Sequence, residues 1–171
     1  MRLASVCFLF LAVTGSAVAS NGAVPSQHAE KDTDKFVRLT EALEADPLRS
    51  DGKAVRGWLM EWLTATPDYT VTICDILGPI PNEDGVPHGP ELLMQQMFGN
   101  AAYQIKTPGQ TDMFSQQLAG MESLLRAYSA ILAKDSGAHI PYFDDLLARQ
   151  RNGSFREFMA LVVGKGCAKK D

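Results

Sequence analysis

The sequence LLMQQMFGNAAYQI, residues 92–105, holds no charged side chain and is the strongest indication of the architecture. Five of its apolar residues form one stripe at helical spacing: Met94, Met97, Phe98, Ala101 and Ile105. Leu92 and Tyr103 point to the opposite side. A helix that is apolar around most of its circumference is typical of the middle of a bundle. We therefore predict a central helix that starts at Pro90 and Glu91, with Gly99 allowing a neighbouring helix to come close.

The next helix is predicted to follow Thr107 and Pro108 and to run to about Lys134. Its apolar residues alternate spacings of four and three: Phe114, Leu118, Met121, Leu125, Tyr128 and Leu132. Such a stripe can be a coiled-coil seam for a partner or the core face of a bundle helix. Because it spans fewer than three full heptads, we favour the core face.

Four further helices follow from periodicity and end signals. The predicted ranges are 34–43, 51–63, 141–150 and 154–164. Ser50 or Asp51 is expected to cap the second of these ranges. Ser154 and Glu157 match the capping-box spacing at the start of the last one.

Residues 68–77 give conflicting signals. Thr66 followed by Pro67 resembles a helix start, whereas the run from Tyr69 to Ile73 alternates and is rich in β-branched residues, which favours a strand. We favour a helix to about Leu77, since a lone strand would have no partner elsewhere in the chain.

Together these patterns predict an all-α protein, a single irregular bundle of about six to seven helices with one disulfide. Residues 78–89 form the one long loop, in which Pro79, Pro81 and Pro87 alternate with Gly78, Gly85 and Gly89. Loops of this length are often functional. The helical domain is expected to span residues 32–171, after a flexible lead-in at 20–31.

Residues 1–19 have the features of an export signal. Arg2 precedes an apolar run, and Ala17-Val18-Ala19 provides small residues before a cleavage point at Ser20. The run is too short for a permanent membrane anchor, and no span is predicted in the mature chain. We expect a periplasmic or extracellular protein.

Cys74 and Cys167 would remain after signal cleavage, because Cys7 lies within the signal. In an oxidising compartment an even pair favours one disulfide, with two free thiols as the alternative. The bridge would close a loop of roughly 90 residues and contribute about 4–5 kcal/mol. Nothing in their surroundings has zinc-ligand spacing, and no metal or cofactor is predicted.

Charge and motifs exclude several function classes. Without Arg2, fifteen basic side chains face twenty acidic ones, a balance that argues against a nucleic-acid partner. No G-x-S-x-G elbow, P-loop or dinucleotide glycine pattern occurs. The histidines are His28, His88 and His139. Only His88 lies in the long loop, and it is near Glu83, Asp84 and Glu91 in the sequence.

The sequence favours a non-enzymatic exported protein that binds a protein or small ligand, such as an inhibitor or immunity-type binder of a secreted enzyme. The candidate binding residues are Glu83, Asp84, His88, Gln95, Gln96 and Asn100. The three amides can line a pocket or satisfy neighbouring backbone inside the bundle.

The main alternative is an envelope or secreted hydrolase. It would use His88 or a carboxylate pair drawn from Glu61, Asp75, Glu91 and Glu122. A structural or stress-related envelope component is a third possibility.

Overall fold

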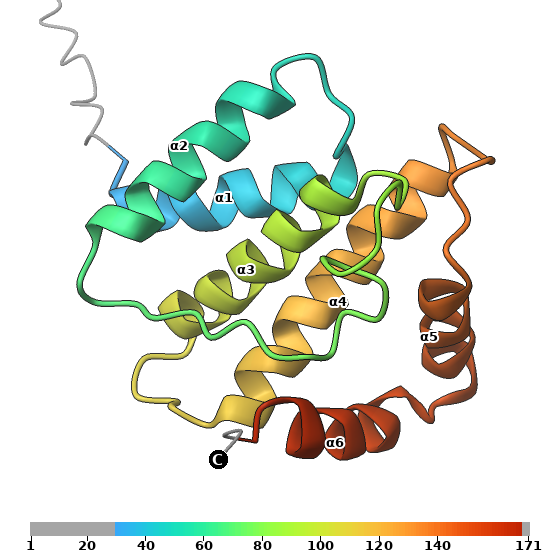
Figure 1. Ribbon diagram of the computed structural model, residues 1–171. Helices are drawn as coiled ribbons and strands as arrows, with labels where there is room; N and C mark the ends of the chain where they lie inside the picture. Colours follow the sequence, from blue (N-terminus) through green and yellow to red (C-terminus); the bar gives the residue numbers. More distant parts are fainter. Residues whose placement is uncertain (1–29, 169–171) are drawn as a thin grey trace, which may run out of the picture.

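The computed structural model describes residues 30–168 and places six α-helices in them (Figure 1). The helices are α1 (Asp32–Ala45), α2 (Gly52–Ala65), α3 (Gly89–Lys106), α4 (Met113–Leu132), α5 (Pro141–Asn152) and α6 (Phe155–Gly166). No strand occurs within these residues. The predicted all-α bundle is therefore confirmed. The predicted signal and most of the lead-in lie outside the described residues.

The central pair consists of α3 and α4, which run antiparallel through the middle of the molecule (Figure 1). Two glycines allow this close packing. A Cβ atom on Gly99 would lie 2.2 Å from the Cβ of Ser123, and one on Gly120 would lie 2.7 Å from the carbonyl oxygen of Gln96. The prediction that Gly99 permits close approach is confirmed.

Two apolar clusters lie on either side of this pair. The first joins α1, α2 and α3 around Phe36, whose ring centroid is 4.8 Å from that of Trp62 and 6.0 Å from that of Phe98. The second joins α4, α5 and α6 around Tyr128 and Phe143, both fully buried. The stripe of α4 points into this second cluster, so it is a core face.

Residues 66–77, here called the strap, form neither the predicted helix nor a strand. Thr66 ends α2 instead of starting a new helix, and its N–H bonds to the carbonyl of Trp62 at 3.0 Å. Four successive β-branched residues, 70–73, disfavour a helix. Side-chain amides take the place of a strand partner, since Gln104 donates to the Thr70 carbonyl at 2.9 Å and Gln117 to that of Thr72 at 2.7 Å.

One predicted helix start and two predicted side-chain caps also need correction. α4 begins at Met113, after a turn in which Asp112 caps the helix by accepting from Ser115 N–H at 2.9 Å. Ser154 precedes α6 without a capping box, because its hydroxyl donates to Asn152 Oδ1 at 2.7 Å. Asp51 precedes α2, but its carboxylate pairs with a neighbouring arginine. In the last two cases a local polar partner competes with the expected capping contact.

The disulfide between Cys74 and Cys167 is present and joins the strap to the end of α6 across 93 residues. Beside it, Asp75 N–H donates to the Gly166 carbonyl at 3.0 Å. Within residues 30–168, no helix combines the length and hydropathy that crossing a membrane requires.

Candidate functional site

The Pro/Gly loop, residues 78–89, is fixed at its base and exposed at its tip. Ile80 is buried in the second apolar cluster, the one around Tyr128 and Phe143. Gly78 has φ of +60°, and the ring of Tyr142 lies against it. A Cβ on Gly78 would lie 2.4 Å from that ring, so only glycine fits this position. The Tyr142 hydroxyl donates to the Ile76 carbonyl at 2.8 Å, and burial raises the pKa of this phenol, which keeps its proton for that bond.

Two cavities flank the loop tip, and Glu83 and Asp84 line both of them. The first, of about 300 Å³, faces the start of α3 and has mainly apolar walls: Ile80, Pro81, Val86, Pro90 and Leu93. The second, of about 210 Å³, faces the start of α5 and is lined by Pro79, Pro87, His139, Ile140 and Pro141. The exposed carboxylates of Glu83 and Asp84 thus lie beside a mainly apolar cavity on one side and a more polar cavity on the other.

His88 lies at the base of the loop and lines neither of these cavities. It precedes α3 in a left-handed conformation, with φ of 53°, and its carbonyl accepts from Leu92 N–H at 3.0 Å. Its Nε2 is 3.3 Å from Asp135 Oδ2. His88 therefore joins the loop to the turn after α4. His139, not selected from the sequence, faces the second cavity and pairs with Asp144 at 3.1 Å.

The three candidate amides are separated from the loop. Gln95, Gln96 and Asn100 are at most 3% exposed and bond inside the bundle. Gln95 Nε2 donates to Ser123 Oγ at 2.8 Å, and Asn100 Oδ1 accepts from Gln104 Nε2 at 2.8 Å. Gln96 Oε1 and Asn100 Nδ2 have no hydrogen-bond partner within the described residues. The structure therefore brings Glu83 and Asp84 together but places the amides between helices.

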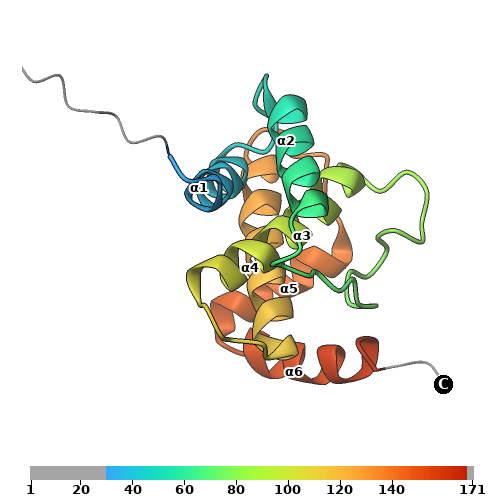
Figure 2. The same ribbon diagram turned by 90° about the vertical axis from the view of Figure 1, so that its left-hand side faces the viewer.

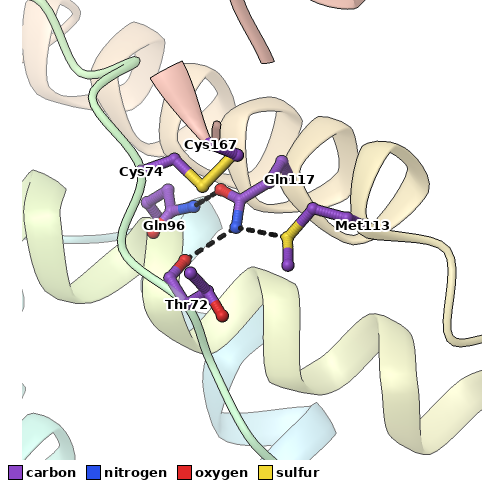
Figure 3. The surroundings of a disulfide bond; sticks show 6 residues. All are labelled: Thr72, Cys74, Gln96, Met113, Gln117 and Cys167. Atoms are coloured by element: carbon purple, nitrogen blue, oxygen red, sulfur yellow. Dashed lines mark hydrogen bonds between the residues drawn. A yellow bond between two sulfur atoms is a disulfide. The ribbon is translucent and has the colours of Figure 1, made fainter. Parts of the chain in front are cut away.

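Gln96 helps to hold the strap beside the disulfide (Figure 3). Its Nε2 donates to Gln117 Oε1 at 2.9 Å, and Gln117 Nε2 in turn donates to the Thr72 carbonyl. Gln117 Nε2 is also 3.6 Å from the sulfur of Met113. The strap, the start of α4 and the end of α6 thus converge at one corner of the molecule.

An apolar groove of about 480 Å³ runs along this corner, between the start of α4 and α6, and Cys167 lines it. The three large apolar side chains that are exposed within the described residues are Ile73, Met113 and Leu161. Met113 lines the groove. Ile73 precedes Cys74, the disulfide partner of the groove residue Cys167, and Leu161 is one turn from the groove residue Gly164. A concentration of exposed apolar surface of this kind is typical of an interaction site.

The four carboxylates considered for hydrolysis lie on separate elements. Glu61 is on α2, Asp75 on the strap, Glu91 in the first turn of α3 and Glu122 on α4. Glu91 lies 3.8 Å from the guanidinium of Arg56. Of five cavities in residues 30–168, none is lined by two of the four, whereas glycoside hydrolysis needs two carboxyl groups within about 5–10 Å of each other.

One charge signal was available in the sequence and was missed. No lysine or arginine occurs between Arg56 and Lys106, yet this interval holds six carboxylates: Glu61, Asp68, Asp75, Glu83, Asp84 and Glu91. The rest of residues 30–168 is balanced, with thirteen acidic and thirteen basic side chains. All six except Glu91 are exposed, and none of these five has an ion-pair partner within the described residues. The net charge is thus concentrated on the strap, the loop and the adjoining part of α2.

Within residues 30–168, no group of three or more histidine, cysteine or acidic side chains is arranged to hold a metal ion. No protein-family model, curated protein or solved structure matches the chain. Any argument about function therefore depends on the geometry of the chain itself.

Proposed function

We propose that the protein is an exported, non-catalytic binding protein whose acidic loop face holds a positively charged protein partner. The acidic loop face is the surface formed by the strap and the Pro/Gly loop. An inhibitor or immunity-type binder of a basic secreted enzyme would have this design.

The observation that carries the proposal is the set of exposed carboxylates without cationic partners. Elsewhere in the described residues four of the nine exposed acidic groups pair with a lysine or arginine, as Glu41 does with Lys106, whereas none of the five exposed carboxylates between Arg56 and Lys106 does. Unpaired charge of one sign on one face speeds the association of a partner of opposite charge and favours the correct orientation.

The surroundings of the carboxylates favour a protein partner. Glu83 and Asp84 adjoin two cavities, the first with mainly apolar walls, and an arginine or lysine side chain can bury its aliphatic part in that first cavity while its charge meets the carboxylates. The apolar groove at the disulfide corner is lined by Cys167, whose disulfide partner Cys74 lies on the strap. Apolar surface with a charged rim is the usual composition of a protein interface.

The direct test uses an arginine-rich peptide with interspersed leucines as the probe. Isothermal titration calorimetry should show saturable binding that weakens as salt rises, because exposed charge pairs are screened. The double variant Glu83→Gln, Asp84→Asn should bind the peptide at least about tenfold more weakly.

The matched control is the double variant Asp32→Asn, Asp34→Asn. It removes the same amount of charge from two exposed carboxylates in the first turn of α1, away from the loop. Binding within twofold of wild type supports the loop face. Equal weakening in both double variants, or no binding by the wild-type protein, would contradict the proposal.

The hydrolase alternative receives no support from the separated carboxylates. It predicts release of product from cell-wall or glycan substrates by the wild-type protein, with loss of that activity in His88→Ala or Glu91→Gln. Such a result would replace the binding proposal.

A further inference from the structure

A further cavity, of about 200 Å³, lies where α1, α3 and α4 meet, and we call it the three-helix cleft. α1 packs on the side of the central pair opposite the strap and loop (Figure 2), and no residue of 66–89 lines the cleft. Its walls include three small residues, Gly99, Ala102 and Ala119. Because the two alanine side chains end at Cβ, space is left open beside them, whereas Gly99 itself lies against Ser123 of α4.

Charged side chains of both signs surround the cleft. Glu41 of α1 pairs with Lys106 of α3, and Glu44 of α1 accepts two bonds from Arg126 of α4, at 2.6 and 2.9 Å. Glu122 also lines the cleft but has no ion-pair partner within the described residues. Three carboxylates therefore share two cations.

Part of this charge is rigidly positioned from inside the bundle. The side chain of Glu44 is only 13% exposed, and its Oε1 accepts from Ser123 Oγ at 2.6 Å. Ser123 in turn accepts from Gln95. Glu44 orients Arg126 through Nε and Nη2, which leaves Nη1 without a hydrogen bond within the described residues. An oriented guanidinium of this kind binds at a low entropic cost.

We propose that the three-helix cleft binds a small zwitterion of the α-amino-acid class. The ligand carboxylate would accept from Arg126 Nη1 and the Lys106 ammonium, and the ligand ammonium would donate to the Glu122 carboxylate. An anion alone would face the surplus carboxylate, and a cation alone would leave the guanidinium edge unused. The volume is below the about 300–1,000 Å³ of drug-sized pockets and suits a molecule of few atoms.

The proposal is tested with glycine and L-alanine as probes, alongside acetate and methylamine, each of which carries one of the two charges. NMR titration of the backbone amides of α1, α3 and α4 should show saturable shifts with L-alanine or glycine. Acetate and methylamine should bind at least about tenfold more weakly, since each loses one charge-assisted contact. Methylamine binding as tight as that of the amino acids, or no saturation with either amino acid, would overturn the proposal.

A variant pair localises the site. Glu122→Gln keeps the size of the side chain and breaks no bond to the described residues, so the fold should be retained, as circular dichroism can verify. It should weaken amino-acid binding about tenfold, whereas acetate binding should not weaken, because the variant removes the carboxylate that an anion alone would face. Glu157→Gln, an exposed change on α6 outside the cleft, is the control and should have no effect. Unchanged amino-acid binding by Glu122→Gln would refute the assignment.

Discussion

Replacing Gly99 with alanine should destabilise the protein, because the central helix pair has no room for a methyl group at this position. The new Cβ would lie 2.2 Å from the Cβ of Ser123, whereas ordinary contacts begin near 3.4 Å. α3 and α4 would have to separate by about 1 Å, which belongs at the upper end of overpacking costs, about 3 kcal/mol. The higher helix propensity of alanine offsets about 1 kcal/mol of this destabilisation. The expected net loss is about 2 kcal/mol.

Gly57→Ala is the matched control, since Gly57 lies inside α2 and a Cβ there would meet no atom within 4 Å. It should stabilise the protein by about 1 kcal/mol. The two variants should therefore differ by about 3 kcal/mol in urea unfolding followed by circular dichroism, or about 6–12 °C in Tm. A Gly99→Ala protein as stable as Gly57→Ala would refute the close-packing argument.

Three further outcomes follow from the structure. Burial raises the pKa of Tyr128 to about 12 from a model-peptide value of 10.0, so the unfolded chain loses this proton first. The stability that Tyr128 contributes should be complete below pH 10 and fall by about 3 kcal/mol as pH rises to about 12, and Tyr128→Phe should flatten that loss in alkaline unfolding curves. Reducing the Cys74–Cys167 bridge should cost about 4–5 kcal/mol, and an unchanged urea midpoint under reductant would contradict this value. Glu44→Ala should cost about 2 kcal/mol, because it leaves the buried Ser123 hydroxyl without its acceptor, whereas Glu41→Ala, at an exposed pair, should cost less than about 1 kcal/mol in the same assay.

The sequence was sufficient to predict the helices whose apolar residues repeat over several turns. Periodicity alone identified the apolar stripe of α4 and the uncharged surface of α3, because the spacing of apolar residues shows which sides of a helix are buried. The disulfide also followed, because Cys74 and Cys167 are the only cysteines outside the predicted signal. These features depend on local spacing or on simple pairing, which a single sequence can provide.

The strap could not be predicted because distant residues determine its conformation. Its carbonyls at Thr70 and Thr72 are satisfied by Gln104 and Gln117, which lie 34 and 45 residues further along the chain. Local propensity gave conflicting signals there, and neither a helix nor a strand formed. The predicted capping box failed for a related reason, since Asn152 competes for the hydroxyl of Ser154.

The candidate site was only partly predictable. Glu83 and Asp84 share one loop, so their proximity was evident, and the structure adds the cavities on both sides. The ion pair between Glu44 and Arg126 joins residues 82 apart and gave no sequence signal, because charged residues on the borders of apolar stripes are common. The absence of basic residues between Arg56 and Lys106 was visible in the sequence and is the feature that separates the acidic face from the rest.

The uncharged polar row of α3 explains how one helix supports two different surfaces. Gln95 bonds toward α1 and supports Glu44 through Ser123, while its neighbour Gln96 bonds through Gln117 to the strap. An amide can donate and accept without the desolvation cost of a buried charge, so it can fix a carboxylate on one side and a backbone carbonyl on the other. A lysine or glutamate at either position would need a buried counter-charge. The absence of charge from residues 92–105 therefore reflects contacts to both faces as well as burial in the core.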